Sequence, residues 1–108
     1  MTTPHPIDLR LTEPAEVIFE AKVLSRFSPV LAVRAAVGQL FEYRTFIGPK
    51  HSSLCILLDG DPGKALTDYV ENDLGLLIAW LTGDSFYGGP RTVARLPFLE
   101  LGSRHSEQ

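Results

Sequence analysis

The sequence has a single cysteine, no long apolar run and no secretory signal at its start, and each absence excludes a class of protein. One cysteine, Cys55, cannot form an internal disulfide, so we expect a reducing compartment, namely the cytoplasm. Cys55 lies in an apolar run and is expected to behave as a small buried hydrophobic residue. No apolar stretch approaches the roughly 18 residues that a membrane-spanning helix needs, so we expect no membrane partner.

An excess of basic residues is also missing. The chain carries 13 acidic and 10 basic residues, for a net charge of -3, and so has no global positive field to attract DNA. A local basic patch remains compatible with this balance, and its candidates are Arg10, Arg26, Arg34, Arg44, Lys50 and Lys64. The 108 residues, 44% of them hydrophobic, predict one globular domain over residues 1–108.

The apolar run from Val17 to Leu24 is interrupted by two opposite charges, Glu20 and Lys22. Residues two apart point to the same face of a strand, so Glu20 and Lys22 share one face and the apolar residues between them take the other. Opposite charges among hydrophobic residues are costly to bury unless they pair or bind an ion. Taken alone, the pattern also fits an ion pair on the exposed face of a strand.

A further acid lies one hairpin away. Residues 7–12 alternate between apolar and polar, which predicts a strand, and a turn containing proline follows. If the turn is centred on that proline, Arg10 faces Ile18 and Asp8 faces Glu20. Directly opposed residues have Cβ atoms about 5 Å apart, and two carboxylates at that distance repel unless a proton or a cation lies between them. Oxygen ligands suit Mg²⁺ or Mn²⁺, which is the cofactor we expect.

Downstream, apolar residues at helical spacing predict a helix from Pro29 to Ile47. Ser28 is a suitable N-cap residue, and proline is favoured in the first helical turn. Gln39 and Tyr43 are four residues apart, so they lie on the same face of this helix and can point at one site.

The remaining elements follow from apolar runs and turn residues. We expect strands over residues 53–58 and 76–81, a helix over 64–73, and a short returning strand that begins at Ser85. The order β-β-α-β-α-β predicts an α/β fold with a mixed β-sheet flanked by helices. Residues 102–108 are expected to form a flexible tail.

The order of an acid, a Glu-x-Lys strand and a Q-x-x-x-Y helix resembles the PD-(D/E)XK nuclease superfamily. Here the acid is Asp8, the strand carries Glu20-Ala21-Lys22 and the helix carries Gln39 and Tyr43. The Q-x-x-x-Y signature is similar to that of RecB-like members. The resemblance covers residues 7 to 80 and implies a restriction-endonuclease-like fold.

The resemblance also implies roles for these residues. Asp8 and Glu20 are expected to hold Mg²⁺, with the backbone carbonyl of Ala21 as the third ligand. Lys22 is expected to orient a water molecule or neutralise charge, and Gln39 and Tyr43 to fix Lys22 or a phosphate oxygen. The implied activity is metal-dependent hydrolysis of phosphodiester bonds, with DNA as the substrate.

Two departures from the family pattern bear on activity. Members usually have a proline directly before the first acid, whereas here Ile7 separates Pro6 from Asp8. The family core also has a helix and a strand before the first acidic strand, but only six residues precede Ile7. We therefore expect a C-terminal part of such a domain, completed by a partner segment or by a second copy in a homodimer. The alternative function is a non-catalytic binding or assembly module with the nuclease fold, which the acidic balance favours.

Overall fold

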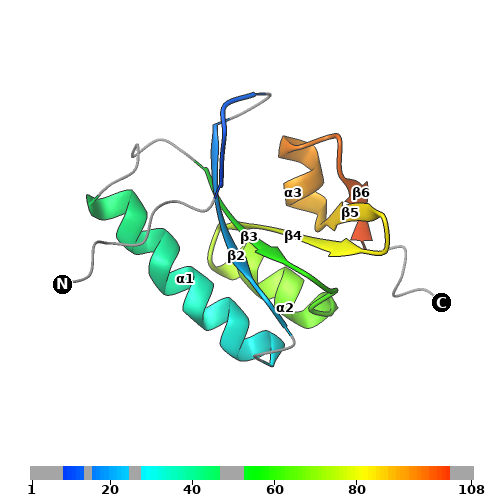
Figure 1. Ribbon diagram of the computed structural model, residues 1–108, viewed down its shortest axis with the longest axis horizontal. Helices are drawn as coiled ribbons and strands as arrows, with labels where there is room; N and C mark the ends of the chain where they lie inside the picture. Colours follow the sequence, from blue (N-terminus) through cyan, green and yellow to red (C-terminus); the bar gives the residue numbers. More distant parts are fainter. Residues whose placement is uncertain (1–8, 14–15, 25–27, 47–52, 103–108) are drawn as a thin grey trace.

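The computed structural model describes residues 9–13, 16–24, 28–46 and 53–102. It confirms the α/β class: a mixed sheet of six strands runs in the order β1-β2-β3-β4-β5-β6, with helices on both of its faces (Figure 1). Among the helices within these ranges, none is long and apolar enough to cross a membrane.

The elements follow the chain in a simple sequence. They are β1 (Leu9–Leu11), β2 (Val17–Lys22), α1 (Pro29–Phe46), β3 (Ser53–Leu58), α2 (Lys64–Asp68), η1 (Tyr69–Asp73), β4 (Leu77–Thr82), β5 (Ser85–Gly88), α3 (Pro90–Arg95) and β6 (Glu100–Leu101). The helix expected over 64–73 is therefore an α-helical turn that continues as the π-helical segment η1. Ser28 caps α1 as expected, since its Oγ accepts a hydrogen bond from the backbone N–H of Leu31 at 3.2 Å.

Strand pairing places the charged residues of β2 at one end of the sheet. β1 and β2 form the expected antiparallel hairpin, and Arg10 lies opposite Ile18 as the turn position predicts. β2, β3 and β4 are parallel, so Lys22 at the end of β2 pairs with Leu58 at the end of β3. β5 is antiparallel to β4, and β6 is parallel to β5.

The sheet separates two clusters of buried side chains. The first lies under α1 and η1 and comprises Ile18, Ala32, Val33, Ala36, Leu40, Tyr43, Leu54, Ile56, Leu58, Val70, Leu76, Ile78 and Trp80. The second lies under α3 and comprises Val17, Phe19, Cys55, Leu77, Ala79, Leu96 and Leu99. The alternation along β2 is the predicted one, because Val17 and Phe19 face α3 whereas Ile18 faces α1. The small residues of α1 allow that helix to lie close to the sheet.

Two features of the C-terminal part differ from expectation. The helix α3 and the strand β6 were not predicted, because α3 is only six residues long and its apolar content is low. A flexible tail was expected from Gly102, but Gly102 is buried, and a Cβ added to it would collide with the indole ring of Trp80. Residues 103–108 of that expected tail lie outside the described residues.

Candidate functional site

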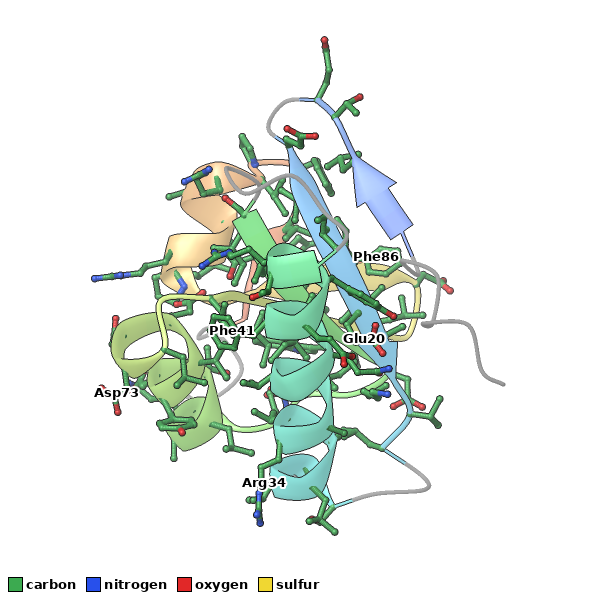
Figure 2. The ribbon with its side chains drawn as sticks, turned by 90° about the vertical axis from the view of Figure 1, so that its left-hand side faces the viewer. Glu20, Arg34, Phe41, Asp73 and Phe86 are labelled. Carbon is green, nitrogen blue, oxygen red and sulfur yellow. The ribbon has the colours of Figure 1, made fainter. Side chains whose placement is uncertain are left out.

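Glu20 and Lys22 lie on the α1 face at the carboxyl end of β2, as their spacing predicts. Figure 2 shows the Glu20 side chain between β2 and α1. The ammonium Nζ of Lys22 lies 3.1 Å from Oε2 of Glu20. Glu20 is buried, with 3% of its surface exposed, whereas the Lys22 side chain keeps 20% exposed. The pair is therefore a buried carboxylate beside a cation that reaches solvent.

Gln39 joins this pair from the helix. The Nζ of Lys22 donates a hydrogen bond to Oε1 of Gln39 at 2.7 Å. Because β2 and β3 are parallel, α1 must run back along β2, and this direction brings the middle of the helix over the end of the strand. The ammonium group is thus held between the carboxylate of Glu20 in β2 and the amide of Gln39 in α1.

Tyr43 lies one helical turn beyond Gln39 and belongs to the core. Its side chain is 1% exposed and is a member of the cluster that also contains Ile18. Because α1 runs back along β2, a residue further along the helix lies nearer the start of the strand. Tyr43 therefore packs beneath the helix in the core, and its expected role in fixing Lys22 or a phosphate oxygen stays a prediction.

The expected metal ligands are only in part described. Asp8 lies outside the described residues, and Ala21 is an exposed residue of β2 that pairs with Leu57. Within the described ranges, no group of three or more His, Cys, Asp and Glu residues is placed to hold a metal ion. Glu20 supplies a buried carboxylate, a ligand type that Mg²⁺ and Mn²⁺ prefer. The donor set fits a divalent cation only if a further acid joins Glu20.

Asp59 contributes a further hydrogen bond near the site. In the sequence, only its position directly after a predicted strand pointed to such a role. It follows β3, and its Oδ1 accepts a hydrogen bond from the backbone N–H of Leu24 at 2.7 Å. Parallel strands bring their carboxyl ends together, so an acid just after β3 is well placed to hold the chain that leaves β2. Asp59 thereby restrains the segment directly after Lys22. From sequence alone, a turn accounted for this aspartate.

Comparison of the chain with protein-family models, with curated proteins and with solved structures finds no match. Its function is therefore inferred from the chemistry of the site.

The arrangement of Glu20, Lys22 and Gln39 has a defined chemical capacity. An ammonium group held by a carboxylate and a neutral amide keeps a fixed position, and fixed cations stabilise negative charge that develops on a bound oxygen. The buried carboxylate can in turn hold a cation or accept a hydrogen bond from water. The site thus combines a fixed cation with a buried carboxylate.

Proposed function

We propose that this chain is a metal-dependent nuclease, or the catalytic fragment of one, that hydrolyses the phosphodiester bonds of DNA on a restriction-endonuclease-like fold. The observation that supports this proposal is the position of the Lys22 ammonium between Glu20 and Gln39. A Glu-x-Lys strand followed by a helix whose glutamine contacts the lysine is the arrangement that the PD-(D/E)XK resemblance implies.

Each residue then has a role. Asp8 and Glu20, with the backbone carbonyl of Ala21, would hold Mg²⁺ or Mn²⁺. A bound divalent cation lowers the pKa of a water molecule and polarises the scissile phosphate. Lys22 donates a hydrogen bond from Nζ to the nucleophilic water or to a phosphate oxygen. Gln39 holds Lys22 in position, and Tyr43 anchors that part of α1 in the core.

A specific observation favours a second candidate, a non-catalytic binding or assembly module. Glu20 is 3% exposed and pairs with Lys22 directly, so the two charges already form a structural ion pair. In such a pair each charge has a partner without any bound metal. The net charge of -3 agrees with a module that does not bind DNA strongly by itself.

We further propose that the chain functions in the cytoplasm as a homodimer or with a partner segment. The buried thiol of Cys55 is compatible with a reducing compartment. β1 has three residues and lies at an edge of the sheet, where it can pair with another strand.

A cleavage assay tests the nuclease proposal. The full chain is incubated with double- or single-stranded DNA in Mg²⁺, in Mn²⁺ and in chelator, together with the variants Lys22→Ala and Glu20→Ala. We expect cleavage that requires the metal and that falls by roughly 10²–10³ in each variant, since each loses an electrostatic group. Lys64→Ala is the matched control, because Lys64 is an exposed lysine paired with Asp68 on α2.

The outcomes separate the two candidates. Retained cleavage in Lys64→Ala together with loss in Lys22→Ala supports catalysis by this site. Wild-type protein that cleaves neither form of DNA in either ion contradicts the nuclease proposal and supports the binding module. Thermal unfolding of each variant verifies that lost activity does not reflect lost structure.

A further inference from the structure

A polar pocket lies at the opposite end of the sheet from Lys22. It has a volume of about 540 Å³, and its lining includes Ser53 and Leu77, which begin β3 and β4. Because β2, β3 and β4 are parallel, these strand starts lie away from the strand end that carries Lys22. A strand of six residues spans roughly 17 Å, so the pocket and the Lys22 site are separate.

Arginine side chains from two elements gather around this pocket. Arg44 comes from the last turn of α1, and Arg91 and Arg95 come from α3. Arg91 and Arg95 are four residues apart, so they lie on one face of their helix. In a chain with a net charge of -3, this is a local concentration of positive charge.

The contacts of these guanidinium groups are with neutral partners. Arg91 donates from Nη1 to the backbone carbonyl of Glu71 at 3.2 Å, and Arg95 donates from Nη2 to Oγ of Ser53 at 2.6 Å. The guanidinium carbon of Arg44 lies 5.7 Å from the centre of the Phe41 ring. These contacts orient the three side chains through neutral groups.

The carboxylate in the pocket lining, Glu71, is directed elsewhere. Its Oε1 accepts the backbone N–H of Arg91 at 3.2 Å. Its Oε2 accepts hydrogen bonds from the backbone N–H of Thr92 at 2.9 Å and from the Thr92 hydroxyl at 2.6 Å. Glu71 is 2% exposed. Its charge therefore serves the start of α3, and the guanidinium groups remain available to a ligand.

Arg44 also contributes a buried hydrogen-bond donor, its Nε atom. Its Nε is buried and has no hydrogen-bond partner among the residues that the structure describes. Buried donors of this kind are rare in folded proteins, because an unpaired donor away from water is unfavourable. Because this atom is shielded from solvent, the guanidinium donors open to a ligand are those of the exposed Arg91 and Arg95.

We propose that this pocket binds a phosphate group, carried either by a nucleotide or by the backbone of a nucleic acid. The planar fork of donors on arginine matches the oxygen atoms of phosphate. The volume of about 540 Å³ exceeds that of phosphate alone and lies within the usual range of ligand pockets, which leaves room for an attached sugar or base. The inference does not rest on the nuclease proposal, because the pocket shares none of its residues with the Lys22 site.

Binding of three probes tests the proposal. The full chain, without divalent metal and at low salt, is titrated calorimetrically with inorganic phosphate, with adenosine 5′-monophosphate and with a short single-stranded oligodeoxynucleotide. We expect at least one probe to bind, and Arg95→Gln to weaken that binding about tenfold or more, since a charged hydrogen-bond donor is removed. Arg91→Gln combined with Arg95→Gln should weaken it further.

Arg34→Gln is the matched control, because it removes the same charge from an exposed position near the other end of α1 (Figure 2). Neither Arg34→Gln nor Lys22→Ala should change the affinity. Competition by phosphate and the mononucleotide indicates a small phosphate-bearing ligand, whereas binding of the oligonucleotide alone indicates a nucleic-acid backbone.

Two results would overturn the proposal. One is the absence of binding by all three probes at millimolar concentration. The other is an equal loss of affinity in Arg34→Gln and Arg95→Gln, which would indicate general electrostatic attraction. If the double variant disturbs α3, the single change at exposed Arg95 decides the matter. Arg95→Lys keeps the charge without the planar fork and should lose less affinity than Arg95→Gln.

Discussion

At the scale of single residues, the sheet accommodates buried ionisable side chains in different ways. Glu20 lies beside the ammonium group of Lys22. Glu71 accepts hydrogen bonds from two backbone N–H groups and a hydroxyl at the start of α3. Cys55 is fully buried, and its burial raises the pKa of the thiol well above the ordinary value, with a smaller contribution from the charge of Glu71. Cys55 therefore stays protonated in the folded chain.

Because Cys55 keeps its proton in the folded chain, we expect the free energy of unfolding to decrease at alkaline pH. Above about pH 9, the thiol of the unfolded chain ionises while that of the folded chain keeps its proton. Unfolding then releases a proton, so the free energy of unfolding falls as pH rises, by up to about 1.4 kcal/mol per pH unit. Urea unfolding at several pH values should show a shallower fall for Cys55→Ala than for the wild type. Equal slopes in the two proteins would contradict this assignment.

At the scale of elements, α3 depends on a residue from another part of the chain. It is six residues long and has no capping hydrogen bond from its own N-cap side chain, since Gly89 occupies that position. Glu71 of η1 supplies the acceptors instead. A Cβ on Gly89 would meet the Glu71 carboxylate within 2.4–2.6 Å, so glycine is needed there for close approach. The Thr92 hydroxyl connects α3 to β4, because its oxygen accepts a hydrogen bond from the backbone N–H of Ile78.

Removing this link should destabilise the chain. Glu71→Ala leaves the donors at the start of α3 without acceptors, and we expect a loss of roughly 3 kcal/mol in the free energy of unfolding. Asp68→Ala, which removes an exposed acid paired with Lys64, should cost less than about 1 kcal/mol. Urea unfolding measures both values. A loss in Glu71→Ala no larger than that in Asp68→Ala would argue against the proposed role of Glu71.

The sequence predicted those strands and helices whose apolar pattern lies within the element itself. Apolar periodicity located β2, α1 and β3, and the spacing of Glu20 and Lys22 predicted their shared face. The spacing of Gln39 and Tyr43 predicted only a shared helix face, and the contact between Gln39 and Lys22 was expected from the family resemblance. In contrast, α3 depends on a carboxylate from η1, and apart from the proline in its first turn its six residues are too few to show a helical apolar pattern. The arginine pocket likewise depends on the packing of α1 against the start of β3.

At the scale of the whole molecule, the described residues leave apolar surface open on the α3 side of the sheet. An apolar pocket of about 240 Å³ lies there between β1 and the C-terminal segment, lined by Leu11, Phe19, Leu57, Ala79, Phe86, Phe98 and Leu99. Phe86 is 47% exposed and Phe98 is 62% exposed. Exposed aromatic residues beside an edge strand favour association with another chain.

We expect the chain to self-associate through this surface. Sedimentation velocity at increasing protein concentration should show a shift from monomer to dimer, and Phe98→Asp should oppose the shift because it places a charge in the apolar contact. Tyr69→Asp is a suitable control, since Tyr69 is a similarly exposed aromatic residue on η1. A stable monomer at high micromolar concentration would exclude the homodimer and leave a partner segment as the alternative.

The contact between Trp80 and Gly102 also makes tryptophan fluorescence sensitive to the position of Gly102. Trp80 is the only tryptophan of the sequence and is 2% exposed. Its ring lies so close to Gly102 that no larger residue fits there without displacement. Intrinsic fluorescence at this position therefore reports whether Gly102, which follows β6, is packed against Trp80 of β4. The emission spectrum can distinguish release of that segment from unfolding of the sheet without any added label.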